Sequence, residues 1–225
     1  MTDIHGAVRR FLLSLGEVLT AGATTHADAV AVDEFARLAS VLRTGSSQAE
    51  AAMPGILPVC RFWDEALDRA ADGPAVLAGH LRALGPSLRW TQNPNYRHRP
   101  PDPAFLENYG YAVIAGPAGD DKPEAARPLV AADALAVGVL LLGPGTYYPA
   151  HHHPASEIYC IVSGDAEWRR GDTPWRRQPP GAVVHHAPNL SHATRARAEP
   201  LLAVYLWRGD LATCATLLEK DLEEN

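Results

Sequence analysis

Residues 145–164 bring three potential metal ligands and a tyrosine into one short segment, GTYYPAHHHPASEIYCIVSG. Side chains two residues apart on a β-strand point to the same face. A strand here would therefore present four chemically useful side chains together: His151, His153, Glu157 and Tyr159. Imidazole nitrogens and a carboxylate oxygen suit zinc, iron, manganese, cobalt or nickel better than calcium or magnesium. The segment predicts part of a site for one divalent transition metal, whose identity the ligand types leave open.

A second group of histidines lies downstream in GAVVHHAPNLSH, residues 181–192. We expect one of them to complete the site from a neighbouring strand. A metal-bound imidazole usually donates its other N–H to a carboxylate, carbonyl or water, so His185 and His186 are candidates for packing or for that outer role. Because neighbouring side chains on a strand alternate, His152 is expected to face away from His151 and His153.

The spacing of the first segment resembles the first motif of the cupin superfamily. That motif is matched without a gap by Gly145, His151, His153, Glu157 and Gly164. The family's second motif is met only in part, by Gly181 and His192, because Ala187, Asn189 and Ala196 stand where the family has Pro, Gly and Asn. Asn visits the left-handed backbone region more readily than other non-glycine residues, so Asn189 is a tolerable replacement. The resemblance implies that His192 is the fourth ligand.

A narrower resemblance extends over residues 145–193. The pattern is similar to the signature of the bacterial cupin-type dimethylsulfoniopropionate (DMSP) lyases and their lyase-like relatives, and its further members are Tyr148, Pro149, Ala155, Tyr159, Gly181, His186 and Ala193. The resemblance implies a small-molecule substrate, DMSP or a related carboxylate, held by a metal on two histidines, a glutamate and a later histidine. It also implies that Tyr159 removes a proton from the carbon next to the substrate carboxylate, so that dimethyl sulfide and acrylate are formed.

The chemistry of such an elimination agrees with these residue types. Removing a proton next to a carboxylate builds a second negative charge, which a bound divalent cation stabilises. A phenol has a reference pKa of about 10 and is a poor base at neutral pH unless a cation lowers that pKa. Tyr148 is a second catalytic candidate, either as an aromatic face for the sulfonium cation or as an additional acid or base. Trp207 is among the aromatic residues expected in the wall of the pocket. The simpler alternative for Tyr159 is a strand tyrosine that fills the barrel.

Two other functions remain open. One is a lyase-like cupin that acts on a different small carboxylate as a lyase, an isomerase or a dioxygenase. The other is a non-enzymatic cupin that binds a ligand without turnover. Of these three functions, DMSP cleavage alone requires a phenolic base together with release of dimethyl sulfide.

The composition limits the class of protein. The 225 residues carry a formal charge of −6 with a pI of about 5.9, which argues against a nucleic-acid-binding face. No long apolar run or signal-peptide pattern is evident, so neither a membrane span nor secretion is expected. Cys60, Cys160 and Cys214 are far apart and predict no disulfide framework, which favours a reducing, cytoplasmic setting. A homodimer is possible.

The periodicity divides the chain into unequal parts. Residues 1–90 form a helical N-terminal region, with apolar residues at helical intervals over 11–19 and 30–42 and further helices expected over 61–71 and 75–84. Residues 91–108 form a proline-rich connecting segment in which neither a regular helix nor a central strand is expected. Short apolar runs then predict a cupin β-barrel over 109–212, with strands at 109–115, 135–142, 157–162, 166–169, 182–185 and 201–206. A C-terminal helix or tail follows over 213–225. The fold class is mainly β, a jelly-roll barrel preceded by helices.

Overall fold

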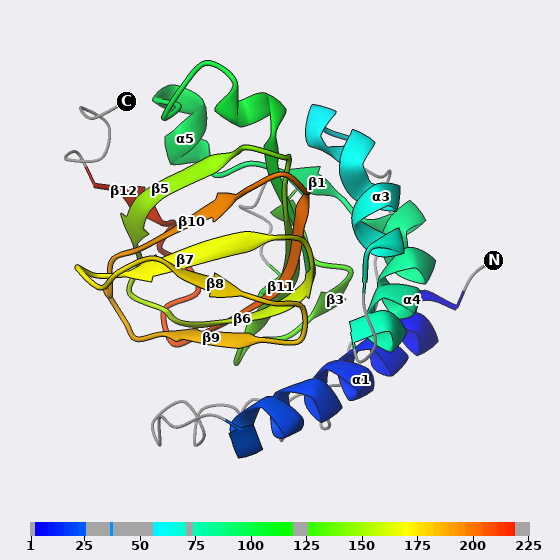
Figure 1. Ribbon diagram of the computed structural model, residues 1–225. Helices are drawn as coiled ribbons and strands as arrows, with labels where there is room; N and C mark the ends of the chain where they lie inside the picture. Colours follow the sequence, from blue (N-terminus) through cyan, green and yellow to red (C-terminus); the bar gives the residue numbers. More distant parts are fainter. Residues whose placement is uncertain (1–2, 26–36, 38–55, 71–73, 119–125, 219–225) are drawn as a thin grey trace.

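The computed structural model describes residues 3–25, 37, 56–70, 74–118 and 126–218, without the side chains of 22–25. The helix expected over residues 30–42 lies outside this part of the chain, apart from residue 37. Within the described residues, a two-sheet barrel carries a layer of helices along one side (Figure 1). This architecture confirms the expected mainly-β cupin jelly roll with helices before it.

The helices precede the barrel and cover the outer face of one of its sheets. Their bounds are α1 Ile4–Thr25, η1 Pro58–Phe62, α3 Trp63–Asp68, α4 Pro74–Leu84 and η2 Gly85–Ser87. Helix α1 packs on α4, and α3 and α4 contact strand β6. Phe11, Leu15 and Leu19 of α1 are fully buried because they recur at helical spacing on the face that meets this layer. The expected first and fourth helices are therefore confirmed.

The third expected helix differs from the prediction at its start. Residues 58–62 form the 3-10 helix η1, and the α-helix begins only at Trp63 and ends at Asp68. Pro58 stands at the first position of η1, where the missing N–H of proline costs no hydrogen bond. Helix α4 ends where Gly85 and Pro86 tighten the chain into η2.

The segment between the helices and the barrel contains more structure than expected. It forms β1 Trp90–Thr91, α5 Pro94–His98 and η3 Phe105–Glu107. The prediction that no regular helix forms here was wrong, because the side chain of Asn93 accepts a hydrogen bond from Asn95 N at 3.0 Å and Pro94 occupies the first helical position. Strand β1 lies at the edge of its sheet, where a strand beside a proline-rich segment is tolerated.

Two sheets form the barrel. The seven-stranded sheet has the order β1-β2-β4-β11-β6-β9, with β3 paired to β2, and the five-stranded sheet has the order β12-β5-β10-β7-β8. The strands are β2 Tyr109–Gly116, β3 Val130–Ala131, β4 Ala136–Leu142, β5 Tyr147–His152, β6 Ser156–Ser163, β7 Ala166–Arg170, β8 Arg176–Gln178, β9 Val183–His186, β10 His192–Ala196, β11 Leu201–Arg208 and β12 Thr216–Leu217.

Six of the strands match the expected apolar runs, namely β2, β4, β6, β7, β9 and β11. The short strands β3, β8, β10 and β12 were not expected, because polar or brief segments give little alternation of apolar residues. Residues 213–225 were expected as a helix or tail. Their described part instead contains β12, which pairs with the edge of β5.

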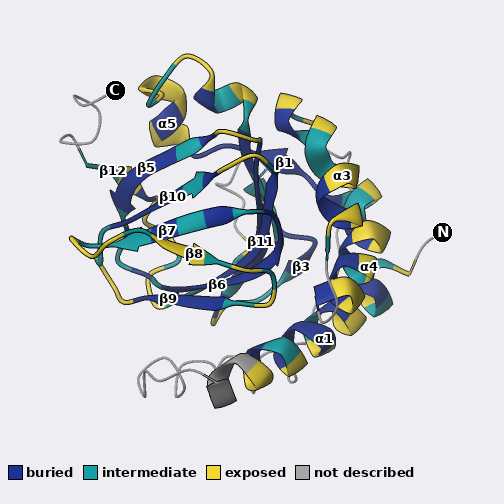
Figure 2. Cartoon of the chain, viewed as in Figure 1, coloured by how far each residue is buried: buried dark blue, intermediate teal, exposed yellow. Residues whose placement is uncertain are grey.

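The seven-stranded sheet is buried on both faces (Figure 2). Its outer face packs under the helices through Ile158, Cys160 and Val204, among others. Its inner face lines the barrel with a second cluster that includes Tyr159, Ile161 and Ala203. Cys160 thus points away from the barrel interior, as its alternation with Tyr159 predicts, and burial raises the pKa of its thiol to about 12.

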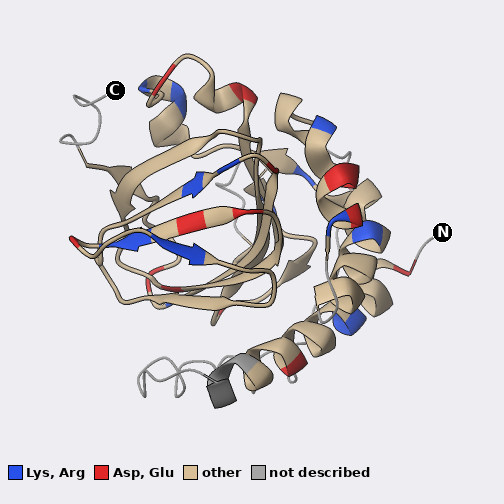
Figure 3. Ribbon diagram, viewed as in Figure 1, with Lys and Arg blue, Asp and Glu red and all other residues tan. Residues whose placement is uncertain are grey.

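The outer face of the five-stranded sheet carries arginines on β7, β8 and β10 (Figure 3). Strands β7 and β8 pair as an antiparallel hairpin joined by residues 171–175. Arg195 and Arg197 pair with Glu167 at 2.7 and 2.9 Å, and Arg177 pairs with Asp165 at 2.6 Å. This exposed surface is therefore a set of solvated ion pairs, each of which contributes little to stability.

Among the described residues, none of the helices combines the length and the hydropathy that a membrane span requires.

The turn before β10 depends on a left-handed residue. Asn189 has a φ of 59°, which no other described non-glycine residue shares in sign, and its backbone N–H donates to the carbonyl of His153 at 2.8 Å. The conformation that the sequence assigned to this position is confirmed. It ties the turn that leads into His192 to the segment that carries His153.

We predict that Asn189→Val lowers the free energy of unfolding by about 1–2 kcal/mol, because a β-branched residue is strained in the left-handed region. Asn189→Gly should change it by less than about 0.5 kcal/mol, since the side chain is exposed and glycine adopts this conformation freely. Denaturant unfolding of the two variants measures the difference. Equal stability of Asn189→Val and Asn189→Gly would contradict the assigned conformation.

Candidate metal centre

The four residues predicted as metal ligands converge inside the barrel. His151 lies on β5, His153 follows that strand, Glu157 lies on β6 and His192 opens β10. Each is at most 2% exposed. One candidate ligand atom from each of His151, His153 and His192 lies within 4.8 Å of the other two.

The route by which these residues meet differs from the prediction. The segment is not one continuous strand, because residues 153–155 separate β5 from β6. Strand β5 belongs to the five-stranded sheet and β6 to the seven-stranded sheet. The histidines and Glu157 therefore reach the same interior from two different sheets, and the turn between them replaces simple alternation along a strand.

Backbone carbonyls fix the orientation of three imidazole rings. The Nδ1 atoms of His151, His153 and His192 donate to the carbonyls of Pro149, Ala155 and Leu190 at 2.9, 3.0 and 2.8 Å. A carbonyl accepts only, so each Nδ1 carries the hydrogen. In the neutral ring each Nε2 is then left with a lone pair, which is the atom and tautomer that a metal ion binds.

Glu157 lies at the centre of the cluster. Its Oε2 lies 3.2 Å from His153 Nε2, 3.2 Å from His186 Nδ1 and 3.1 Å from His192 Nε2. Its Oε1 accepts a hydrogen bond of 2.6 Å from the indole N–H of Trp207. Burial acts to raise the pKa of Glu157, but the charge and hydrogen bond of His153, with contacts from His186 and His192, hold that pKa well below its usual range.

The contact between His192 and Glu157 is informative. Nε2 of His192 is buried without a hydrogen-bond partner among the described residues, although it lies 3.1 Å from the carboxylate. A lone pair and a carboxylate oxygen at that distance repel unless a cation lies between them. Nε2 of His153 faces the same oxygen, and although burial disfavours its charged form, Glu157 raises the pKa of His153. The imidazole and carboxylate groups of this cluster fit a divalent metal, and binding of the metal would displace a proton from Nε2 of His153.

His186 belongs to the cluster and contacts a ligand candidate, which agrees with the outer role that the sequence offered for it beside plain packing. Its ring stacks on that of His192 with centroids 3.9 Å apart, and its Nδ1 lies 3.2 Å from Glu157 Oε2. Burial, followed by the nearby His192, lowers the pKa of His186 to about 3, so the ring is neutral at neutral pH and donates Nδ1–H to Glu157. Its register opposite Glu157 on the paired strands β6 and β9 could not be read from the sequence alone.

The remaining two histidines of the segments lie outside the cluster. Potential ligand atoms gather in two overlapping groups, one of His151, His153 and His192 and the other of Glu157, His186 and His192. His152 is only partly buried and belongs to neither group, as predicted. His185 alternates with His186 on β9 and contacts Ser156 Oγ through Nε2 at 3.1 Å. His152 therefore faces away from His151 and His153, and His185 faces away from His186.

Both candidate catalytic tyrosines line the barrel interior. Tyr159 is 5% exposed and its ring centroid lies 5.8 Å from that of His186. Burial raises the pKa of the Tyr159 phenol well above its ordinary value, and the negative charge of Glu157 adds to the effect. The residues of the chain alone therefore oppose ionisation of Tyr159, so its use as a base requires a cation beside it.

Tyr148 and Trp207 pack directly on ligand candidates. The ring of Tyr148 stacks on His151 with centroids 4.1 Å apart and planes inclined by 9°. Trp207 stacks on His153 at 4.1 Å while its N–H reaches Glu157. Trp207 was expected as part of an aromatic wall, and its hydrogen bond to a ligand candidate goes beyond that expectation. Two aromatic rings thus limit how far His151 and His153 can rotate.

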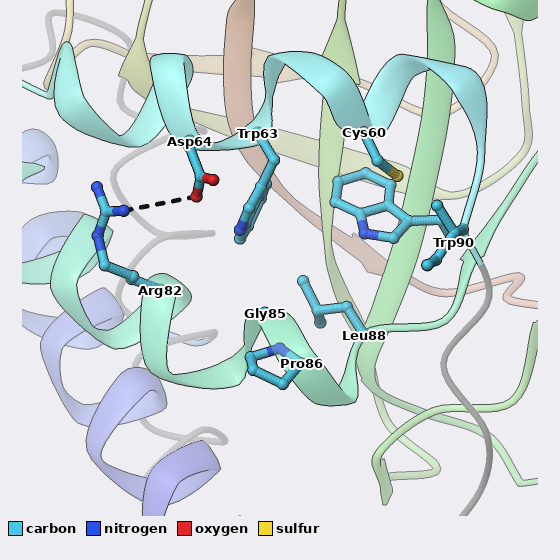
Figure 4. A pocket seen from close by; sticks show the side chains of 9 residues that line it. Cys60, Trp63, Asp64, Arg82, Gly85, Pro86, Leu88 and Trp90 are labelled. Carbon is cyan, nitrogen blue, oxygen red and sulfur yellow. Dashed lines mark ion pairs between the residues drawn. The ribbon is translucent and has the colours of Figure 1, made fainter.

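A pocket of about 340 Å³ lies elsewhere, on the outer side of the barrel (Figure 4). It is lined by residues of η1, α3, α4, η2 and β1 and includes Trp63 and Trp90, whose ring centroids are 5.3 Å apart. None of the clustered histidines lines it. The pocket is therefore separate from the candidate metal centre, whose side chains are almost completely enclosed.

Several known proteins are similar to this chain in sequence or in fold. The family model for dimethylsulfoniopropionate lyase matches residues 31–203. The chain is 47% identical over 87 residues to DMSP lyase DddQ of Ruegeria pomeroyi, which is 39% of this chain and 43% of that protein. It is 30% identical over 161 residues to the putative DMSP lyase DddL of Cereibacter sphaeroides, which is 69% of this chain and 61% of that protein. The alignments thus span between two fifths and two thirds of these curated relatives.

Two solved structures agree over nearly the whole chain. A chain from crystal structures of the DMSP lyases RdDddP and RnDddQII superposes with a TM-score of 0.73 at 23% identity and covers 96% of this chain and 100% of that one. The crystal structure of DddQ from Ruegeria pomeroyi superposes with a TM-score of 0.68 at 28% identity and covers 91% of this chain and 95% of that one. Because the family model matches more than half of its residues, this chain belongs to the DMSP lyase family.

Proposed function

We propose that the protein binds one divalent transition metal and cleaves DMSP to dimethyl sulfide and acrylate. The observation that carries the proposal is the buried phenol of Tyr159 beside a carboxylate and imidazole cluster, in a chain of the DMSP lyase family. A base and a metal-binding set inside one enclosed space are the two parts that an elimination next to a carboxylate needs.

The metal ligands in this proposal are His151, His153, Glu157 and His192. Support comes from the three carbonyl-oriented imidazoles and from the unpartnered Nε2 of His192. Outer partners then hold Glu157, since Trp207 donates to one carboxylate oxygen and His186 to the other. Such partners typically change metal affinity by about 10–100-fold when they are removed.

Tyr159 is the base in the proposed reaction. Its phenolate oxygen takes the proton from the carbon next to the substrate carboxylate, and the electron pair of that C–H bond forms the new C=C bond. The C–S bond breaks and dimethyl sulfide leaves as a neutral molecule, so the leaving group needs no proton. The bound cation supplies Lewis-acid stabilisation of the charge that develops on the carboxylate and favours the phenolate form of Tyr159.

Enclosure and aromatic surfaces suit this substrate. A sulfonium cation is favoured over an aromatic face, and Tyr148 presents a ring next to the ligand His151. Removing water from the site strengthens each charge interaction within it. A metal held by His151, His153, Glu157 and His192 would stabilise the carboxylate of this zwitterion, and Tyr148 would contact its sulfonium group.

We predict that His192→Ala lowers metal affinity by more than about 100-fold, because it removes a ligand rather than an outer partner. His152→Ala is the matched control, since this neighbouring histidine lies outside the cluster and should retain wild-type metal content. Elemental analysis of dialysed protein measures both. Wild-type metal content in His192→Ala would remove His192 from the ligand set.

We predict that Tyr159→Phe reduces the rate of dimethyl sulfide release by about 10²–10⁴-fold while metal content stays unchanged, because it removes only the base. Tyr147→Phe loses a phenol from the outer surface of β5 and should retain wild-type turnover. Headspace gas chromatography of dimethyl sulfide measures the rate. Intact turnover in Tyr159→Phe would rule out the tyrosine-initiated elimination and favour a cupin that acts on another small carboxylate.

A further inference from the structure

Tyr96 is a buried phenol that reaches the candidate site from outside the barrel strands. It lies on α5, is fully buried, and its hydroxyl is 3.1 Å from the hydroxyl of Tyr148. The ring of Tyr148 stacks in turn on His151. A direct chain of contacts therefore runs from the segment before the barrel to a proposed metal ligand.

The position of Tyr96 is fixed by contacts on all sides. Its ring packs against Phe105, Tyr109 and Tyr148 with centroids 6.0, 5.7 and 5.7 Å away. The amide groups of Asn93 and Asn95, which precede it in the chain, both donate to the carbonyl of Ala215 at 2.9 Å.

A third amide ties the start of this segment to the barrel. Gln92 donates to the carbonyls of Leu106 and Tyr109 at 2.6 and 2.9 Å. Polar residues that resemble a linker in the sequence therefore serve to hold α5 against the strands that follow it. A side chain anchored in this way has little rotational freedom left to lose when a ligand binds.

The hydrogen-bonding capacity of the two phenols shows what the contact does. The hydroxyls of Tyr96 and Tyr148 each have one hydrogen and two lone pairs. Whichever of the two donates across the 3.1 Å contact, Tyr148 keeps a hydrogen or a lone pair for a group inside the site.

We propose that Tyr96 is a positioning residue that fixes the hydroxyl of Tyr148 so that this phenol can contact the substrate. The proposal rests on the proposed function, in which Tyr148 faces the substrate at the metal. Tyr96 itself touches neither the substrate nor the metal and acts through Tyr148.

The test uses four purified, metal-loaded proteins: wild type, Tyr96→Phe, Tyr148→Phe and the double variant. Tyr147→Phe is the matched control, since it removes a phenol oxygen one residue from Tyr148 on the opposite face of β5. Rates of dimethyl sulfide release give kcat and KM, calorimetric titration gives the affinity for acrylate, and thermal unfolding shows that each variant is folded.

We expect Tyr96→Phe to lower kcat/KM for dimethyl sulfide release and the affinity for acrylate each by about 5–30-fold, the range for a lost buried hydrogen bond. The double variant should be no slower than Tyr148→Phe, because Tyr96 acts through Tyr148. Multiplicative losses in the double variant would overturn the proposal. So would a Tyr96→Phe variant that behaves like Tyr147→Phe.

Acrylate binding separates this proposal from the proposed function. If wild type releases no dimethyl sulfide, the proposed function is wrong and the same cycle is evaluated on acrylate affinity. A loss in Tyr96→Phe that disappears in the Tyr148→Phe background then supports the positioning role. Equal affinity of wild type and Tyr96→Phe would then overturn it.

Discussion

The carboxylate of Glu157 is enclosed by imidazoles, and the rest of the barrel interior is organised around it. A buried carboxylate costs several kcal/mol unless it is paired and hydrogen-bonded. Here one oxygen accepts from Trp207 and the other faces His153, His186 and His192. The Nδ1 hydrogens of His153 and His192 are already bonded to carbonyls, so their Nε2 atoms can face the carboxylate either as protonated donors or with a metal ion between them. The buried carboxylate and its imidazoles could hold a metal ion, and the charge that makes their burial costly is what would attract that ion.

The jelly-roll topology explains how such a cluster can be assembled. From β4 onward the strands alternate between the two sheets, apart from the pair β7 and β8, so β5 and β10 supply histidines from one side while β6 and β9 supply Glu157 and His186 from the other. Helices cover the outer face of the seven-stranded sheet through an apolar layer. The inner face is then free for aromatic and titratable residues, and the segment before the barrel adds Tyr96 to it. The stability of the fold and the chemistry of the site are carried by opposite faces of the same strands.

Much of this could be predicted from the sequence, and the misses have physical causes. The ligand types and their spacing predicted His151, His153 and Glu157, and the resemblance to the cupin motifs added His192. The fold brings these four residues together. Alternation correctly assigned Cys160 to the outer face and His152 away from the site. The prediction of one continuous strand failed between residues 153 and 157. There a turn connects the two sheets, although the spacing of the ligands is the one expected on a strand. Tyr96 was not assigned to the site, and for His186 packing and an outer role were both left open. The position of His186 depends on strand register and that of Tyr96 on the side-chain amides that anchor α5, and neither is a local property of the sequence.

The central claim is that a metal ion on this cluster is required for elimination from DMSP. It is tested most directly by measuring dimethyl sulfide in the headspace over purified protein as isolated, after removal of metal with a chelator, and after addition of zinc, iron, manganese, cobalt or nickel. We predict that release falls to below about 1% of its initial rate when the metal is removed, the extent expected if the Lewis acid is lost, and that at least one metal restores it. Release that continues unchanged in protein shown by elemental analysis to be metal-free would contradict the claim.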